Sequence, residues 1–304
     1  MKNRTALVVS LFVLIYLLMS GHAALADGGL TKIADNVYSY ADVKNGFPAN
    51  SFGANAGIII GKDGIIVVDT LVSAKEAQRF ISDIRKVSDK PFKYVINTHY
   101  HLDHAFGNAE FEKMGAIIIS HEADNNNLHN SGEAVLKNAG AYGLTESDIE
   151  GTSIAYPSLT FPSRMIINMD GQEIELIYPG PSHTSGSIMV YLPDQKILFA
   201  GDILFTGYHP FLAEGDISSW TKALDSIMAM DVEKIIPGHG PVSGKKDIRD
   251  MKAYLKAFDS KAKELCAGSN DVEYIVSEIK KSLPQRPEGE FLITGNIQMK
   301  YLKK

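Results

Sequence analysis

Histidine and aspartate residues are concentrated in one short stretch of this sequence. The heptapeptide THYHLDH places His99, His101, Asp103 and His104 directly after Tyr94–Asn97, whose apolar residues predict a buried strand. Alternate residues at a strand end point the same way, so His99 and His101 are expected to face one metal ion. Asp103 and His104 are then expected to turn toward a second metal ion. Imidazole and carboxylate groups at this density predict a metal site.

Three more candidate ligands lie further along the chain, each at the start of a loop that follows a strand-like segment. His183 lies in GPSHTSG, Asp202 in FAGD and His239 in PGHG. The glycine near each of them allows the backbone to turn sharply and to approach a ligand closely. Together with the first group, these residues predict two neighbouring metal sites.

The order of these motifs resembles the pattern of the metallo-β-lactamase superfamily, which is HxHxDH, a distant histidine, an aspartate and a final histidine. The hairpin that ends at Asp69 and the segment PGHG match as well. The resemblance implies two metal ions bridged by Asp202. It further implies that one metal is held by His99, His101 and His183, and the other by Asp103, His104 and His239.

Imidazole and carboxylate ligands favour zinc, which tolerates the open coordination that catalysis needs. We therefore expect two Zn2+ ions per chain. Two metal ions about 3.5 to 4 Å apart lower the pKa of a shared water toward about 7, so a metal-bridging hydroxide is the expected nucleophile. Its target would be the carbonyl of a thioester, lactone, ester or β-lactam, with Asp103 and Asp202 as the catalytic carboxylates. The sequence thus predicts a dinuclear zinc hydrolase.

Departures from the pattern bear on the substrate. The β-lactamases of this fold carry a cysteine, or no metal ligand, where Asp202 stands, and a nearby lysine, whereas ILFT follows Asp202 here. An aspartate at this position is similar to the glyoxalase II, lactonase and general hydrolase branches. The stretch from Tyr208 to Trp220 looks like exported hydrolases of the SoxH-like or quinoprotein-relay type. We therefore expect at most weak β-lactamase activity.

Tyr208 and His209 follow Asp202 closely and are candidate substrate contacts at the mouth of the site, although a surface loop explains them equally well. His121 precedes a probable helix start and is expected to cap it. The aromatic residues Phe52 and Tyr142 lie in loop-like regions and are expected either in the pocket wall or in the core.

Alternating strand and helix signals predict the elements that position these residues. Ala56–Asp69 is typical of a hairpin whose two apolar strands are covered on both faces, and Ser73 is the expected N-cap of a helix to about Val87. Together with the resemblance, the pattern predicts an α/β fold, the four-layer αβ/βα metallo-β-lactamase sandwich with C-terminal helices. The polar segment His121–Pro162 is expected to form helices that wall the site. Further strands are expected at 116–119, 173–178, 187–192, 197–200 and 234–236, and further helices after Asp216, over 247–267 and 271–283, and after Pro287.

The N-terminus has the composition of a secretory signal peptide. Lys2 and Arg4 precede an apolar run, Ala6–Met19, of about 14 residues, whereas a membrane-spanning helix needs roughly 20. The tripeptide ending at Ala26 predicts cleavage there. We expect residues 1–26 to be a signal peptide and 27–304 a hydrolase domain with a helical extension from about 245. A periplasmic or secreted protein without a stable membrane anchor follows.

The composition indicates a folded chain with a small-molecule substrate. Its 304 residues are 45% hydrophobic, enough for a full core, and the formal net charge is -6. The positive charges are scattered, which argues against a nucleic-acid partner. Cys266 is the single cysteine, so an internal disulfide is excluded. The sequence does not indicate an oligomeric state.

Two other functions stay open. A mononuclear iron dioxygenase of the same fold acts on persulfides with fewer of these ligands. Two metals are favoured instead by the presence of all four of His101, Asp103, His104 and His239. A non-catalytic, metal-dependent periplasmic binding protein is the alternative from a different class. A small phosphodiester substrate also remains possible, because two metals serve phosphoryl chemistry equally well.

Overall fold

A computed structural model describes residues 29–40 and 47–302. The predicted signal peptide, residues 1–26, lies outside the described residues. Within the described part of the chain, no helix is both long enough and apolar enough to cross a lipid bilayer.

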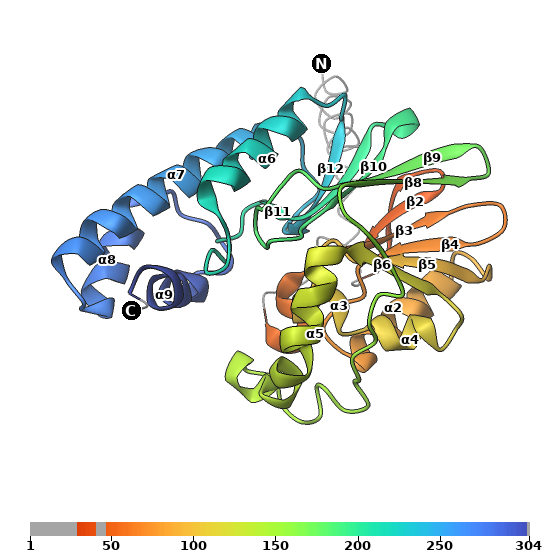
Figure 1. The fold of residues 1–304 in the computed structure, drawn as a ribbon, viewed down its shortest axis with the longest axis horizontal. Helices are drawn as coiled ribbons and strands as arrows, with labels where there is room; N and C mark the ends of the chain where they lie inside the picture. Colours follow the sequence, from red (N-terminus) through yellow and green to blue (C-terminus); the bar gives the residue numbers. More distant parts are fainter. Residues whose placement is uncertain (1–28, 41–46, 303–304) are drawn as a thin grey trace, which may run out of the picture.

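The described strands form two sheets that lie face to face (Figure 1). Neighbouring strands are parallel from β4 to β7 and between β11 and β12, and antiparallel elsewhere, so both sheets are mixed. The order in the first sheet is β1 (Thr31–Ala34), β2 (Val37–Tyr40), β3 (Ala56–Ile60), β4 (Ile65–Val68), β5 (Phe92–Ile96), β6 (Ile117–His121) and β7 (Leu159–Phe161). The order in the second is β12 (Lys234–His239), β11 (Ile197–Phe205), β10 (Met189–Leu192), β9 (Gln172–Ile177) and β8 (Arg164–Met169).

The apolar strands of the first sheet are buried on both faces, as the sequence predicts. Ile59 and Ile66 pack in the layer between the two sheets, together with Val190 of β10. Ile58 and Ile65 belong to a separate cluster on the other face. Because successive side chains of a strand point to opposite faces, a continuous apolar run requires cover on both sides.

Helices provide the outer layers. Phe80 of α2 (Ala74–Arg85) and Phe111 of α4 (Asn108–Glu112) pack against the outer face of the first sheet. Trp220 of α6 (Ile217–Ala229) and Leu255 of α7 (Lys245–Gly268) pack against the second, where they meet Leu198 of β11. The order of layers is helix, sheet, sheet, helix. The predicted α/β fold class, a four-layer αβ/βα sandwich with C-terminal helices, is therefore confirmed.

Polar side chains begin three of these helices where the sequence places them. The Ser73 hydroxyl accepts a hydrogen bond from the backbone N–H of Glu76 at the start of α2. Asp216 caps α6 in the same way. His121 caps α5 (Glu122–Lys137), since its Nδ1 accepts from the N–H of Ala123 at 3.1 Å. Each cap satisfies an N–H group that the helix leaves without an internal partner.

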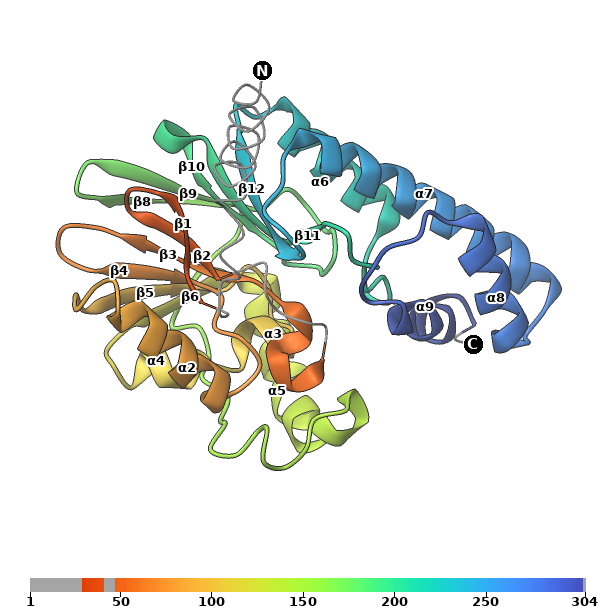
Figure 2. The same ribbon diagram turned by 180° about the vertical axis from the view of Figure 1, so that it is seen from behind.

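The chain ends in helices that extend beyond the sheets (Figures 1 and 2). Helix α7 leads to α8 (Val272–Ser282), α9 (Phe291–Asn296) and a π-helical turn, η4 (Ile297–Tyr301), which lie near the distal part of α7. Ile275, Ile293 and Ile297 are buried in the same apolar cluster as α6 and α7. The C-terminal helices are thus continuous with the core, and the boundary near residue 245 stays a prediction.

Two strands run further than the sequence suggests, and the difference moves two site residues out of loops. β11 continues from Ala200 to Phe205, so Asp202 lies within a strand. β12 continues to His239, which is its last residue. The register between the two strands shifts at Gly201, whose φ is 49°. This irregularity lets the strand continue while it redirects the Asp202 side chain.

Candidate metal centre

The predicted ligands come together at one edge of the two sheets. His99 and His101 follow the end of β5, and Asp103 and His104 lie on the short helix α3 (Leu102–Ala105). The remaining three come from the loop between β9 and β10, from β11 and from the end of β12. Ligand atoms of three triads each lie within 4.8 Å of one another, and the triads are His99, His101 and His183; Asp103, His104 and His239; and His99, His104 and Asp202.

In the first triad, the Nε2 atom of His183 lies 2.9 Å from Nδ1 of His101. Two ligand atoms that are each about 2.0 to 2.1 Å from a tetrahedral zinc ion lie about 3.3 to 3.4 Å apart. The spacing of these nitrogens therefore suits a single metal ion that both contact. His99 presents its Nε2 to the same space.

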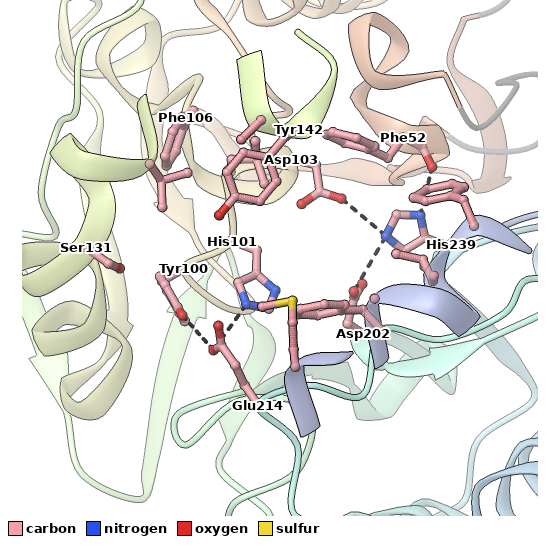
Figure 3. A pocket seen from close by; sticks show the side chains of 18 of the residues that line it. Phe52, Tyr100, His101, Asp103, Phe106, Ser131, Tyr142, Asp202, Glu214 and His239 are labelled. Carbon is pink, nitrogen blue, oxygen red and sulfur yellow. Dashed lines mark hydrogen bonds and ion pairs between the residues drawn. The ribbon is translucent and has the colours of Figure 1, made fainter. Parts of the chain in front are cut away.

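In the second triad, Asp103 Oδ2 lies 3.3 Å from Nε2 of His239 and 3.7 Å from Nε2 of His104. Both separations are close to the spacing expected for ligands of one tetrahedral ion. Figure 3 shows Asp103 and Asp202 directed toward His239 from different elements. The arrangement provides a second position with two nitrogens and one carboxylate.

The carboxylate of Asp202 lies between the two triads. Its Oδ2 is 3.3 Å from Nε2 of His183, in the first triad, and 3.5 Å from Nε2 of His239, in the second. Its Oδ1 is 3.1 Å from Nε2 of His104. A carboxylate in this position can contribute one oxygen to each of two metal ions. The sequence resemblance implies a bridging role for this residue, and its place between the triads is compatible with that prediction.

Each candidate histidine has its other ring nitrogen occupied by a protein group. Nδ1 of His104 lies 2.9 Å from Asp69 Oδ2. Nδ1 of His183 faces the backbone oxygen of Phe211 at 3.1 Å, and Nδ1 of His239 faces that of Phe52 at 3.2 Å. Partners of this kind fix the tautomer and the ring orientation of metal-binding histidines. The free nitrogens are thereby directed toward the centre.

Some of the inward-facing atoms lack a hydrogen bond. Among the described residues, His99 Nε2, His104 Nε2 and Asp202 Oδ1 are buried atoms without a hydrogen-bond partner. His104 Nε2 and Asp202 Oδ1 are close but not aligned for a hydrogen bond. A buried polar atom without a partner costs about 1 to 3 kcal/mol, and metal coordination is one way to satisfy it. The donor set therefore fits a pair of divalent cations.

The charges of the centre also suit cations. Burial raises the pKa of Asp202, but the surrounding histidines hold it well below its ordinary value, so the carboxylate is ionised. Burial lowers the pKa of His183 to about 3 and keeps the ring neutral. Burial alone would lower the pKa of His239, but Asp202 and Asp103 raise it to about 9. Ionised carboxylates and neutral imidazoles are the metal-binding forms, so metal binding at His239 releases a proton.

Two glycines make room for the bridging carboxylate. A Cβ atom at Gly238 would lie 1.8 Å from Asp202 Oδ1, far inside van der Waals contact. A Cβ atom at Gly201 would lie 2.5 Å from the Thr98 hydroxyl oxygen. The glycines of the FAGD and PGHG motifs are thus required because the side chains of neighbouring elements occupy the space beside them.

A cavity of about 370 Å³ opens onto the centre. Asp103, Asp202 and His239 lie in its wall (Figure 3). The predicted contact Tyr208 lies in the wall as well, and its hydroxyl donates to the backbone oxygen of Phe52 at 2.8 Å. Tyr208 therefore offers its ring to a substrate, since its proton is already used. The structure corrects the prediction that His209 contacts the substrate. His209 is absent from the cavity wall and buried against Tyr254, whose hydroxyl lies 2.6 Å from Nδ1.

The polar segment after His121 does wall the site, as expected. Ser131 and Val135 of α5 line the cavity, and so does Tyr142 of the short helix η2 (Ala139–Tyr142). Phe52 of η1 (Pro48–Gly53) is a wall residue as well. A segment without clear periodicity in the sequence thus contributes to the site through its side chains.

Sequence reasoning missed two acidic residues that support the centre. Asp69, at the end of β4, receives hydrogen bonds from the N–H and hydroxyl of Thr98, each at 2.7 Å, besides its contact with His104. Glu214 lies 3.4 Å from Nε2 of His101 and receives the hydroxyl of Tyr100 at 2.6 Å. Burial raises the pKa of Glu214, but His101 and Tyr100 lower it to about 2. The sequence offered a signal for Asp69, because this residue directly follows an apolar strand. No sequence pattern pointed to Glu214.

The fold and these motifs agree with what is known of other proteins. A family model for the metallo-beta-lactamase superfamily matches residues 50–239, and the chain belongs to this superfamily. The match ends before the C-terminal helices. Among solved structures, a metallo-beta-lactamase from Pontibacter korlensis is similar with a TM-score of 0.61 and 21% identity, covering 75% of this chain and 98% of that one. The DIM-1 metallo-beta-lactamase is similar with a TM-score of 0.59 and 20% identity, covering 75% of this chain and 96% of that one.

Related sequences carry different activities in their names. A type 2 metallo-beta-lactamase of Elizabethkingia meningoseptica is 24% identical over 77% of this chain and 87% of its own length. A linear primary-alkylsulfatase of a Pseudomonas species is 26% identical over 64% of this chain and 43% of its own length. The alpha subunit of a 2,4-dinitroanisole O-demethylase of a Nocardioides species is 28% identical over 60% of this chain and 51% of its own length. The chain spans about half the length of the last two, and the three names do not agree on a substrate.

Proposed function

We propose that this protein is a dinuclear zinc hydrolase that cleaves a carbonyl compound, namely a thioester, lactone, ester or β-lactam. The observation that carries the proposal is the Asp202 carboxylate, which contacts histidines of both triads at the wall of a cavity. The donors are imidazoles and carboxylates, which zinc accepts in catalytic sites. Zinc ions held there would polarise the carbonyl oxygen and lower the pKa of a nearby water.

The residues of the chain have distinct tasks in this proposal. Burial raises the pKa of Asp103, but His104 and His239 lower it, so its carboxylate is ionised and able to accept a proton. Its Oδ2 faces the two histidines, which leaves Oδ1 to take the proton of the attacking water and pass it to the leaving group. Asp202 holds the two triads at a fixed separation.

The wall of the cavity excludes bulk water from the reaction. The rings of Phe52, Phe205 and Tyr208 lie around the second triad, and Phe205 stacks on His239 with ring centroids 5.0 Å apart. Electrostatic interactions are stronger where water is excluded. An apolar wall beside the ligands therefore strengthens the attraction between the Asp103 carboxylate and the neighbouring histidines, and the polarisation of a bound carbonyl.

We further propose that the protein is exported, on the composition of residues 1–26, and that its partner is a small molecule. The similarity to a β-lactamase supports hydrolysis in general, while the aspartate at position 202 supports a substrate other than a β-lactam drug. The names of the other relatives extend the candidates to alkyl sulfates and aryl methyl ethers.

A substrate panel tests this function. The zinc-loaded protein is assayed on an acyl thioester, a lactone, an aryl ester and a β-lactam, with an alkyl sulfate, an aryl methyl ether and a persulfide as comparison substrates. We expect chelator-sensitive hydrolysis of at least one carbonyl compound, with the β-lactam among the slower ones. Cleavage of the sulfate or the ether alone would contradict carbonyl chemistry. Oxygen consumption on the persulfide, with an iron-loaded protein and no hydrolysis, would favour the dioxygenase.

A further inference from the structure

The walls of the cavity above the metal centre are apolar over most of their extent. They come from segments far apart in the sequence: the turn η1, helices α3, α5 and η2, strand β11 with the loop after it, and the C-terminal α9 and η4. The residues that make the apolar wall include Leu102, Phe106, Val135, Tyr142, Phe211 and Phe291. A cavity with such walls and few polar groups is typical of a site for an apolar ligand.

The rim of this cavity exposes large apolar side chains to solvent. Tyr142 of η2 is 43% exposed, Phe291 of α9 is 54% exposed and Met299 of η4 is 49% exposed. Removing apolar surface from water is favourable, so a ligand that covers these side chains gains binding free energy. A cluster of exposed apolar groups therefore marks a binding site. Met299 also lies on a π-helical turn, an irregularity that is frequent at functional sites.

The described lining of the cavity lacks the long basic side chains of lysine and arginine. Among the described residues that form the cavity wall, none is lysine or arginine. Two basic side chains bonded to backbone near the lining residues have these other partners: Arg286 donates to the backbone oxygen of Tyr208 at 3.2 Å, and Lys300 to that of Gly215 at 2.5 Å. Nothing in the wall is therefore placed to neutralise an anionic group of a substrate away from the metal centre.

Glu214 adds a negative charge to the same wall. Its carboxylate lies beside His101 and Tyr100, on the side of the first triad, and it is ionised at neutral pH like any ordinary glutamate (Figure 3). It is a carboxylate in addition to the candidate ligands Asp103 and Asp202. An anionic substituent that reaches this part of the cavity meets electrostatic repulsion from Glu214, whose side chain is 41% exposed to solvent.

We propose that the cavity selects substrates whose group next to the scissile bond is a long, apolar and uncharged chain, and that Glu214 rejects chains that carry a carboxylate. The chain lies along the apolar wall and reaches the rim formed by Tyr142, Phe291 and Met299. The part of this inference that concerns substrate preference rests on the proposed hydrolysis. The binding of an apolar chain can be measured without turnover.

Binding of linear 1-alkanols, from butanol to decanol, tests the wall by calorimetry on the zinc-loaded chain. We expect affinity to rise about fourfold per added methylene until the chain fills the cavity, which is the gain expected for burying a methylene group. Phe291→Ala should remove at least half of this gain for the longest alkanols. Tyr274→Ala is the matched control, because Tyr274 is a similarly exposed aromatic, 49%, on the neighbouring helix α8 and outside the cavity wall.

Hydrolysis tests the charge selection. p-Nitrophenyl heptanoate is compared with mono-p-nitrophenyl adipate, whose acyl chain is similar in length but ends in a carboxylate. We expect the neutral ester to be preferred in kcat/KM, and Glu214→Gln to reduce the preference on the order of tenfold. The ratio within one variant cancels any general effect of Glu214 on His101 or on metal content.

The outcomes separate this inference from the proposed function. Alkanol affinity that does not depend on chain length, or that falls equally in Tyr274→Ala, would overturn the apolar site even if esters are hydrolysed. A preference that is unchanged in Glu214→Gln would overturn the role of Glu214. A normal chain-length dependence with no hydrolysis of any carbonyl compound would support the apolar site and contradict the hydrolase.

Discussion

Replacement of Asp202 by alanine is expected to reduce hydrolysis on the order of a thousandfold and to lower the zinc content of the protein. Its carboxylate lies within 3.8 Å of histidine nitrogens in both triads, so both metal positions lose a ligand at once. Loss of one preorganised group that acts directly on the reacting centre costs about 10² to 10³ in rate, and here metal occupancy falls as well. Steady-state rates and elemental analysis of the purified variant measure both effects.

Asp83→Ala is the matched control for this variant. Asp83 receives the hydroxyl of Tyr40 at 3.1 Å and pairs with Lys86 on the outer helix α2, away from the centre. We expect it to keep full zinc content and the wild-type rate. An Asp202→Ala protein that retains two zinc ions and more than a tenth of the rate would contradict the bridging role.

Removal of both zinc ions is expected to lower the melting temperature by roughly 20 °C. A ligand present at a thousand times its Kd stabilises the folded state by about 4 kcal/mol per site, and 1 kcal/mol corresponds to about 2 to 4 °C in a domain of roughly this size. Burial lowers the pKa of His99, and the neighbouring His104 lowers it further. A cation relieves the unfavourable burial of the carboxylates beside them.

Calorimetric melting with zinc, with a chelator and with magnesium in place of zinc checks this prediction. Magnesium should give no increase, because it disfavours a nitrogen-rich donor set. The increase with zinc should shrink as the pH falls below about 9, since protons then compete for His239. An equal melting temperature in zinc and in chelator would show that these residues do not form a zinc site in the folded chain.

The candidate ligands could be found from the sequence because their signals are local. THYHLDH follows an apolar strand directly, and GPSHTSG and PGHG carry glycines beside their histidines. Alternation along a strand then predicts which side chains share a face, and the apolar hairpin predicts a sheet covered on both sides. The fold class and the convergence of these residues follow from the same patterns and the order of the motifs.

The rest of the site depends on relations between distant segments that no local pattern records. The position of Asp202 inside β11 depends on the irregular pairing with β12 at Gly201. Tyr208 and His209 are neighbours in a single loop, and only the packing of Tyr254 from α7 decides that His209 points into the core. The C-terminal wall could not be foreseen either, since Phe291 reaches the cavity only because α8 and α9 turn back along α7.

Glu214 illustrates the same limit for electrostatics. A lone glutamate in a loop before a helix is usually a solvated residue, and nothing in the spacing of residues 206–216 indicates a partner for it. The fold brings it to Tyr100 and His101, more than a hundred positions away in the sequence. The influence on substrate choice that we propose for Glu214 therefore depends on tertiary structure alone.

Zinc titration of the chelator-treated protein tests the central claim most directly. Bound metal is counted by elemental analysis at each step, and the hydrolysis rate on the best carbonyl substrate is measured in parallel. We predict that the rate reaches its maximum only as occupancy approaches two zinc ions per chain. A rate that is already maximal at one metal per chain, or a protein that gains activity with one iron and oxygen but not with zinc, would contradict the dinuclear zinc hydrolase.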